Sequence, residues 1–254
     1  MQGIAVRGHR GFACLAATVF CAFACASARS ETAAAVTASI GGTSDFVFRG
    51  LSYTRGDPAA QGSLDVEIAQ GAYAGTFVST TNPNAGPSPN MEIDLWAGYH
   101  HAFNDSLSAD LRYTHYMYPD DPRVADYDRN EFTATLGVRN VLFLSASYSP
   151  DTEAVGAAPP HAPTGDEAWA LEFSVQHVFT PRWSVSLGAG RYLLEEVYGD
   201  DYTYWGVTLV ANLAPVELDF SVLGTDSTAE RLFTSHAAGE RFAFTVLYRF
   251  TLSK

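Results

Sequence analysis

Cysteine is missing from most of this 254-residue chain: Cys14, Cys21 and Cys25 are the three cysteines, and all lie within the first 28 residues. The remainder therefore has no disulfides, no thiolate metal site and no cysteine nucleophile. Lysine is nearly absent as well, because Lys254 is the single one. The formal net charge is −13, and an acidic chain without a basic patch argues against nucleic acid as a partner.

Long apolar runs are missing too. After residue 28 no window holds the roughly 18 apolar residues that a transmembrane helix needs. At the start of the chain, a basic head with Arg7 and Arg10 precedes a short stretch of apolar and small residues, which ends in an A-x-A cleavage pattern at Ala28. We therefore predict a secretory signal peptide at 1–28, which is removed, and an exported domain at 29–254.

A period of two residues runs through the exported part of the sequence. In 241–252 apolar side chains alternate with small or charged ones, and the same alternation recurs in 91–103 and 167–179. Such alternation is typical of strands with one apolar and one polar face, and no segment shows a helical period. We predict strands at 36–53, 59–69, 72–80, 91–103, 107–117, 130–139, 141–149, 167–179, 182–192, 202–211, 215–224 and 241–252.

The connections between these strands alternate in length. Short turns such as Gln70-Gly71 and Thr180-Pro181 interleave with longer polar loops such as 81–90 and 150–166. An even number of strands of about ten residues, with short turns at one rim and long loops at the other, is typical of outer-membrane barrels. We predict an all-β fold: a single-chain, antiparallel, up-and-down transmembrane β-barrel of about 12 strands in the outer membrane of a Gram-negative cell, with its lipid bilayer as a partner.

The two faces of the strands differ in composition. One face is rich in Phe, Leu, Val and Tyr, whereas the other carries Ser, Thr, Gly, Ala and isolated charges instead of the many lysines of a solvated surface. We predict that the apolar face contacts lipid and that the polar face lines the lumen. Aromatic residues near the strand ends would form interfacial girdles: Tyr53, Tyr99, Tyr113, Trp169, Phe179, Trp183, Tyr192 and Trp205.

The stretch SDFVFRG is predicted as the upper half of the first strand, with Phe46 and Phe48 toward lipid and Asp45 and Arg49 toward the lumen. Residues 54–58 would then form the first external loop. Asp45 and Arg49 share a face but lie about 13 Å apart along a strand, which is too far for an ion pair. We therefore expect their partners on other strands.

For Arg49 the expected partner is Asp65 or Glu67 on the adjacent strand. With these residues, fourteen charged side chains are predicted to line the lumen, nine acids and five arginines. This excess of acids predicts a polar channel with a mild cation preference. The predicted lumen-lining residues are Asp45, Arg49, Asp65, Glu67, Glu92, Asp94, Asp110, Arg112, Arg139, Glu172, Glu217, Asp219, Arg241 and Arg249.

The segment SDFVFRGLSYTRGDPAAQGSLDVE (44–67), followed by GAYAGTFVST (71–80), resembles the opening signature of the TorF family of bacterial outer-membrane porins. MEIDLWAGYHHAF (91–103) fits the next family segment, and the later strands resemble the family in rhythm. Phe77 stands where the family commonly has Trp. Phe250, the final aromatic, is followed by four more residues, whereas the signals read by the outer-membrane assembly machinery, an expected partner during biogenesis, commonly end on the aromatic.

The predicted function is a porin-like channel for the passive diffusion of small polar solutes or ions, with no cofactor or metal. Two alternatives stay open. The charges could pair across strands and fill a non-conducting structural barrel. The barrel could also be an outer-membrane lipid hydrolase with Ser, His and Asn on its outer face. Because none of the strand histidines His100, His101, His115 and His177 has a serine two residues on, we predict that the protein is not an enzyme.

Overall fold

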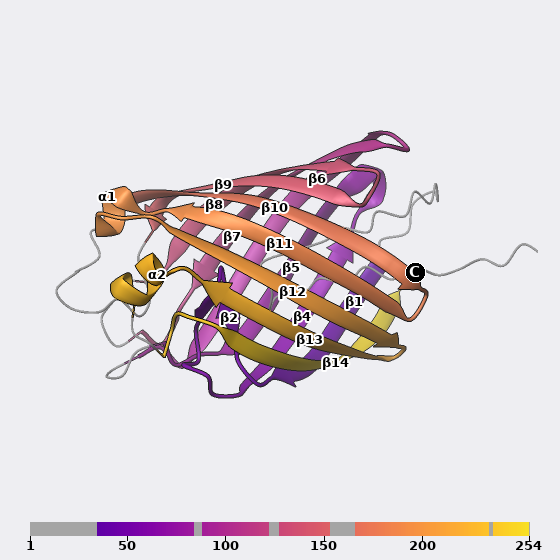
Figure 1. The fold of residues 1–254 in the computed structure, drawn as a ribbon. Coiled ribbons are helices and arrows are strands. Elements are labelled where there is room, and N and C mark those ends of the chain that lie inside the picture. Colours follow the sequence, from indigo (N-terminus) through magenta and orange to yellow (C-terminus); the bar gives the residue numbers. More distant parts are fainter. Residues whose placement is uncertain (1–34, 84–87, 122–126, 153–165, 234–235, 254) are drawn as a thin grey trace, which may run out of the picture.

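The chain forms a closed barrel of tilted antiparallel strands (Figure 1). The structure is a computed structural model, and it describes residues 35–83, 88–121, 127–152, 166–233 and 236–253. The predicted signal peptide at 1–28 and most of the predicted loop 150–166 lie outside these ranges. The predicted fold class, an up-and-down antiparallel barrel of 12 strands, is confirmed.

Each wall strand pairs with its sequence neighbour, and the first strand pairs with the last, so that the barrel has no open edge. The strand boundaries lie within a few residues of the predicted ones, except at the end of the first strand. The wall strands are β1 (Ala35–Thr43), β4 (Ala59–Glu67), β5 (Ala72–Thr80), β6 (Met91–Asn104), β7 (Leu107–Met117), β8 (Arg129–Val138), β9 (Leu142–Thr152), β10 (Asp166–Thr180), β11 (Trp183–Leu193), β12 (Tyr202–Leu213), β13 (Val216–Thr225) and β14 (Arg241–Ser253).

The two rims differ. Short turns, including the 3-10 turn η1 (Ala69–Gly71), lie at the rim where β14 ends; we call it the short-turn rim (Figure 1). The longer connections lie at the opposite, long-loop rim, where they carry two short helices that the sequence did not predict, α1 (Glu195–Tyr198) and α2 (Ser227–Leu232). Asp226 caps α2, because its side chain accepts hydrogen bonds from the first-turn amides. No helix in the described ranges has the length and apolar character to span a bilayer.

The alternation of side chains assigns the two faces of the wall. Large apolar side chains point outward, and the exposed fraction reaches 78% for Phe242. On the inner face, hydroxyl pairs bridge neighbouring strands around the ring, with oxygen–oxygen distances of 2.9 Å in each of four pairs. The wall is therefore apolar outside and polar inside. The four pairs are Ser39–Ser63, Thr133–Ser147, Thr135–Ser145 and Thr208–Ser221.

The predicted first strand, 36–53, is wrong in its second half. β1 ends at Thr43, and residues 44–58, which we call the inserted loop, leave the wall. Most of residues 45–54 are buried in the lumen, where they form a small hairpin of β2 (Val47–Phe48) and β3 (Leu51–Ser52), whereas 56–58 are exposed. Phe46 is 3% exposed and Phe48 packs against buried residues, so neither faces lipid. The predicted external loop 54–58 forms the return of the inserted loop, and its first residue, Thr54, is buried.

Backbone conformation explains why the strand breaks there. Arg49 and Gly50 at the hairpin turn have φ angles of 47° and 78°, which belong to the left-handed region and not to an extended strand. Gly50 is also tightly enclosed, because an added Cβ would lie 2.6 Å from Thr225 Cγ2 and 2.9 Å from Tyr204 Cβ. The turn therefore requires a residue without a side chain at position 50.

The girdle prediction needs a related correction. Tyr53 and Tyr192 are only 6% and 7% exposed and belong to the interior cluster, so they do not face the membrane interface. Both were assigned to the girdle because they lie near predicted strand ends. The other six aromatics predicted for the girdles are exposed on the outer wall: Tyr99, Tyr113, Trp169, Phe179, Trp183 and Trp205.

Candidate functional site

The candidate functional site is the lumen, which the inserted loop occupies near the long-loop rim. Phe46 stacks at a tilt on Phe77 of β5 and on Tyr53, with ring centroids 5.7 Å and 5.6 Å apart. Phe48 meets Tyr116 of β7 edge-on at 5.9 Å. Phe46, Tyr53, Phe77 and Tyr116 belong to one buried cluster, against which Phe48 packs. The cluster also contains Trp96, Tyr118, Tyr127, Tyr192, Tyr198, Tyr202, Tyr204 and Phe233. This layer of the lumen is therefore filled by side chains.

Arg49 at the tip of the inserted loop connects the loop to the far wall. Its Nη1 donates to Glu131 Oε2 of β8 at 2.7 Å, and both side chains are at most 4% exposed. The guanidinium also lies over the rings of Phe48 and Tyr192, 4.8 Å and 4.7 Å from their centroids. The Tyr202 hydroxyl donates to the Arg49 carbonyl oxygen at 3.0 Å. The expected pairing of Arg49 with the neighbouring strand is wrong, because Arg49 pairs with a strand across the lumen.

The charge of Arg49 persists in this buried position. Arg49 belongs to the inserted loop, outside the strands of the wall. Burial alone would lower the pKa of its guanidinium, but the carboxylate of Glu131 and nearby tyrosines raise that pKa above its ordinary value. The pair is therefore a charged, desolvated contact, and removing either partner would leave the other buried without its counter-charge.

A second buried arginine, Arg129, was not among the predicted lumen charges. It lies 3.8 Å from the ring centroid of Tyr116 and donates to the Tyr118 hydroxyl at 3.4 Å. That hydroxyl donates in turn to Glu92 at 2.6 Å. The sequence prediction also missed Glu131. Strand parity could have found both, because they lie two and four residues before Thr133 on the inner face of β8.

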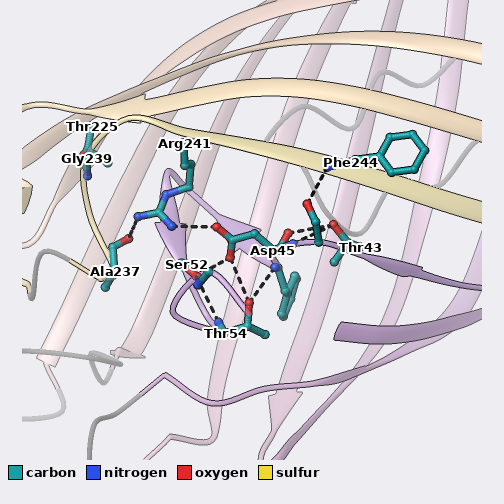
Figure 2. A network of polar contacts seen from close by, with 12 residues as sticks. Thr43, Asp45, Ser52, Thr54, Thr225, Ala237, Gly239, Arg241 and Phe244 are labelled. Atoms are coloured by element: carbon teal, nitrogen blue, oxygen red, sulfur yellow. Dashed lines mark hydrogen bonds and ion pairs between the residues drawn. The ribbon is translucent and has the colours of Figure 1, made fainter. Parts of the chain in front are cut away.

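Asp45 is the centre of a second network, which fastens the inserted loop to β14 (Figure 2). Its carboxylate accepts hydrogen bonds from Arg241 Nη1 at 2.8 Å, from Thr54 Oγ1 at 3.0 Å and from the Ser52 hydroxyl. Arg241 Nη2 also donates to the carbonyl oxygen of Ala237 at 2.7 Å. One arginine thus holds together the inserted loop, the last strand and the loop that precedes that strand.

A further set of lumen charges lies toward the short-turn rim. Arg249 of β14 makes two contacts with Glu217 of β13, at 2.5 Å and 3.2 Å. The neighbouring inner-face residue Asp219 is buried, and among the described residues neither of its carboxylate oxygens has a hydrogen-bond partner. Asp65 and Glu67 of β4 are half-buried.

Other inward carboxylates are held by tyrosine hydroxyls. Tyr73 donates to Asp110 at 2.8 Å, and Tyr204 donates to Glu172 at 2.7 Å. His100 Nδ1 lies 3.9 Å from Asp110 Oδ2. No group of three His, Cys, Asp or Glu side chains in the described ranges is arranged to hold a metal ion.

The structure places thirteen of the fourteen predicted lumen charges inside the barrel. Asp45 and Arg49 reach the lumen through the inserted loop, and eleven others point inward from the wall. Arg139 is the exception, because it lies exposed in the β8–β9 turn with a φ angle of 54°. Its parity is correct for the inner face, but β8 ends one residue earlier, so Arg139 stands at the rim. The eleven are Asp65, Glu67, Glu92, Asp94, Asp110, Arg112, Glu172, Glu217, Asp219, Arg241 and Arg249.

A polar network on the outer wall bears on the hydrolase alternative. His115 Nδ1 lies 3.0 Å from Asn130 Oδ1. Histidine and asparagine are two of the three residue types expected in such a catalytic site. Ser149, whose hydroxyl donates to the backbone carbonyl of Asn130 at 2.7 Å, is buried and shares the inward parity of Ser145 and Ser147 on β9. Among the described residues no hydrogen bond joins a serine hydroxyl to the His115 ring, so these contacts do not make a nucleophile–base pair.

The barrel resembles solved porin structures. The structure described as the KdgM porin matches with a TM-score of 0.53 and 10% identity, over 84% of this chain and 99% of that chain. The NanC porin matches with a TM-score of 0.53 and 12% identity, over 85% of this chain and 100% of that chain. At such low identity the likeness concerns the fold alone. No curated protein matches the chain at a significant level.

The sequence itself matches a family model over almost its whole length. The model is described as "Bacterial protein of unknown function (Gcw_chp)", and it covers residues 27–254. The match includes all twelve strands of the wall and the inserted loop. The chain therefore belongs to the Gcw_chp family of bacterial proteins.

Proposed function

We propose that the protein is an outer-membrane channel for the passive diffusion of small polar solutes or ions. The observation that carries this proposal is a closed wall with large apolar side chains outside and hydroxyl pairs and charges inside. Closure satisfies the backbone groups of every strand in lipid, and a hydroxyl-lined interior of this kind suits water and polar solutes. Cleavage of a leader at residue 28 and insertion by the outer-membrane assembly machinery belong to the same proposal.

The lumen would prefer cations to anions. Carboxylates outnumber arginines on the inner face, and the half toward the short-turn rim holds Asp65, Glu67 and Asp219. Rings of carboxylates lower the barrier for cation entry and raise it for anions. The resemblance of 44–80 to the TorF porins agrees with a channel of this kind.

The test is electrical. Protein expressed with its leader and purified from outer membranes is inserted into planar bilayers, together with a variant in which a short Gly-Ser turn replaces 45–57. We expect discrete conductance steps from the shortened barrel, and a reversal potential in a salt gradient that indicates cation preference. Asp65→Asn with Glu67→Gln should move this potential toward zero, whereas Arg191→Gln on the outer wall should leave it unchanged. A folded, shortened barrel without conductance would contradict the proposal.

A non-conducting structural barrel is the second candidate. It is favoured by the buried aromatic cluster, which fills the lumen near the long-loop rim. The shortened variant separates the two candidates, because removing the inserted loop from a channel restores a path, whereas a barrel packed throughout its interior stays silent. Heat-modifiable migration on gels shows in each case that the barrel has folded.

A further inference from the structure

We propose that the inserted loop is a gate, which closes the lumen and can move out of it as one rigid unit. Two ion pairs, which we call latches, hold the loop in its closed position, which we call its seat. The first latch joins Asp45 to Arg241, and the second joins Arg49 to Glu131. This inference rests on the proposed channel function, because a gate requires a path to close. It assigns to residues 44–58 a role in regulation that is separate from the selectivity of the lumen.

The position of the loop suits a plug. The loop connects β1 and β4, which are neighbours in the wall, and its tip contacts β8 on one side and β11 on the other. In the order of strands around the ring, β8 lies four strands from β4, and β11 lies four strands from β1. The loop therefore extends across the lumen instead of lining one side of it.

The wall is complete without the loop. β1 pairs directly with β4 from Ala35 opposite Glu67 to Thr43 opposite Ala59, which continues to the last residue of β1. β1 also pairs with β14 up to Thr43. At the base of the inserted loop the Ser44 amide donates to the Phe244 carbonyl of β14 at 2.9 Å, whereas the β-pairing of the hairpin residues is internal to the loop. The hairpin can therefore move without opening the barrel.

The loop is a compact unit with its own backbone hydrogen bonds. Val47 and Phe48 pair with Leu51 and Ser52, and the Tyr53 amide donates to the Phe46 carbonyl at 2.7 Å. These bonds can survive a rigid movement of the hairpin. At its return to the wall, Gly56 has a φ angle of 83° and an added Cβ would meet nothing within 4 Å. This open segment is suited to serve as a hinge.

The fastening of the hairpin to the wall consists of a few charged contacts and packing against aromatic rings. Arg241 reaches Asp45 from β14, and Glu131 reaches Arg49 from β8, so the two latches hold opposite ends of the hairpin. Two backbone contacts add to them, from the Ser52 amide to Ala237 at 2.8 Å and from the Asn82 amide to Tyr53 at 2.7 Å. Loss of one latch should therefore weaken the seat without removing it.

A reversible tether tests the gate directly. Val47 of β2 and Ala243 of β14 lie in one buried cluster, and the chain has no cysteine after residue 28, so Val47→Cys with Ala243→Cys introduces two thiols into that cluster. Loss of free-thiol labelling on oxidation shows that the disulfide has formed. In planar bilayers the oxidised barrel should be silent, and addition of a reductant should restore the openings of the wild type. The two single-cysteine variants are the controls, and their conductance should not respond to reductant.

Latch variants supply a second measurement. Arg241→Gln and Glu131→Gln should each raise the fraction of time in the open state at least about tenfold, which corresponds to about 1.4 kcal/mol. Arg191→Gln, which breaks an ion pair with Asp201 on the outer wall, should leave the open fraction unchanged. The variant with a Gly-Ser turn in place of 45–57 provides the reference for a permanently open barrel.

The outcomes separate the gate from the channel. A tethered barrel that conducts equally in its oxidised and reduced forms overturns the gate and leaves the channel intact. Silence of the wild type and both latch variants, with conductance from the shortened barrel, also overturns it, because the loop is then a permanent plug. Silence of a folded, shortened barrel overturns the proposed function itself.

Discussion

The two halves of the lumen solve the burial of charge in different ways. Near the long-loop rim, Arg49 and Arg129 are enclosed between carboxylates, tyrosine hydroxyls and aromatic rings, and scarcely any of their surface is exposed. Near the short-turn rim, Asp65 and Glu67 are half-buried and Asp219 has no hydrogen-bond partner among the described residues. The first half has the packing of a protein core, and the second half has an excess of negative charge.

This difference assigns separate tasks to the two halves. A packed layer in which opposite charges touch can hold a segment in place, but it offers no path to a solute. A polar layer with more carboxylates than arginines can attract cations. Closure therefore belongs to the half near the long-loop rim, and ion preference to the half near the short-turn rim.

Among these predictions, replacing Arg49 should have the largest effect, because it weakens the binding of the inserted loop in the lumen. Arg49→Met leaves Glu131 buried without its counter-charge, and breaking such a pair costs about 3–5 kcal/mol. We expect hydrogen–deuterium exchange at the Ser52 and Asn82 amides, which join the loop to its surroundings, to accelerate by two to three orders of magnitude, or roughly 3–4 kcal/mol. Arg191→Met is the matched control, because its ion pair is exposed and contributes about 1 kcal/mol or less. Unchanged protection in Arg49→Met would show that the aromatic packing alone seats the loop.

The two glycines of the inserted loop provide a smaller and sharper test. Gly50→Ala places a Cβ against Thr225 and Tyr204 at a positive φ, and should weaken the seat by about 2–4 kcal/mol. Gly56→Ala also has a positive φ but meets no neighbour, so we expect a loss of about 1–2 kcal/mol. Exchange at the Ser52 amide, which donates to the Ala237 carbonyl outside the loop, measures the effect of both substitutions. Equal effects would mean that the tip is not confined.

A substitution in the half near the short-turn rim should have the smallest effect, and it should stabilise the protein instead of destabilising it. Asp219→Asn removes a buried carboxylate that lacks a partner and lies beside Glu217, so the free energy of unfolding should rise by about 1 kcal/mol. Glu217→Gln instead loses the charge that faces Arg249, and should lower stability. Urea unfolding of the purified barrel in lipid measures both variants. A loss of stability in Asp219→Asn would contradict the view that this half carries unmatched charge.

The wall could be predicted from the sequence because its physical signal is local. Alternation with period two and the interleaving of short and long connections gave strand boundaries within a few residues, as in β7 and β5, which match exactly the predicted 107–117 and 72–80. Parity then placed residues such as Glu217 and Arg249 on the inner face. Arg139 shows the limit of parity, because a strand that ends one residue early leaves the next side chain in a turn.

The inserted loop could not be predicted in this way. Phe46 and Phe48 would share one face of an extended strand, opposite Asp45, Val47 and Arg49, and period two does not distinguish lipid from a packed interior. The one local sign is Gly50, because a glycine within a strand pattern is found both where a strand bends and where the chain leaves the strand. The partners of Arg49 lie 82 and 143 residues away, on β8 and β11, so they follow from the closed barrel and not from neighbouring sequence.

Asp45 and Arg241 meet across 196 residues of sequence, and Arg241 opens the last strand of the wall. The loop follows the first strand directly, yet every surface that receives it is made later in the chain. During biogenesis the hairpin therefore cannot bind in the lumen until β14 has paired with β1, because its binding site is incomplete before that step. The order of events follows from the connectivity: an unfinished barrel contains an unseated loop, and the arrival of the loop marks the completion of the wall.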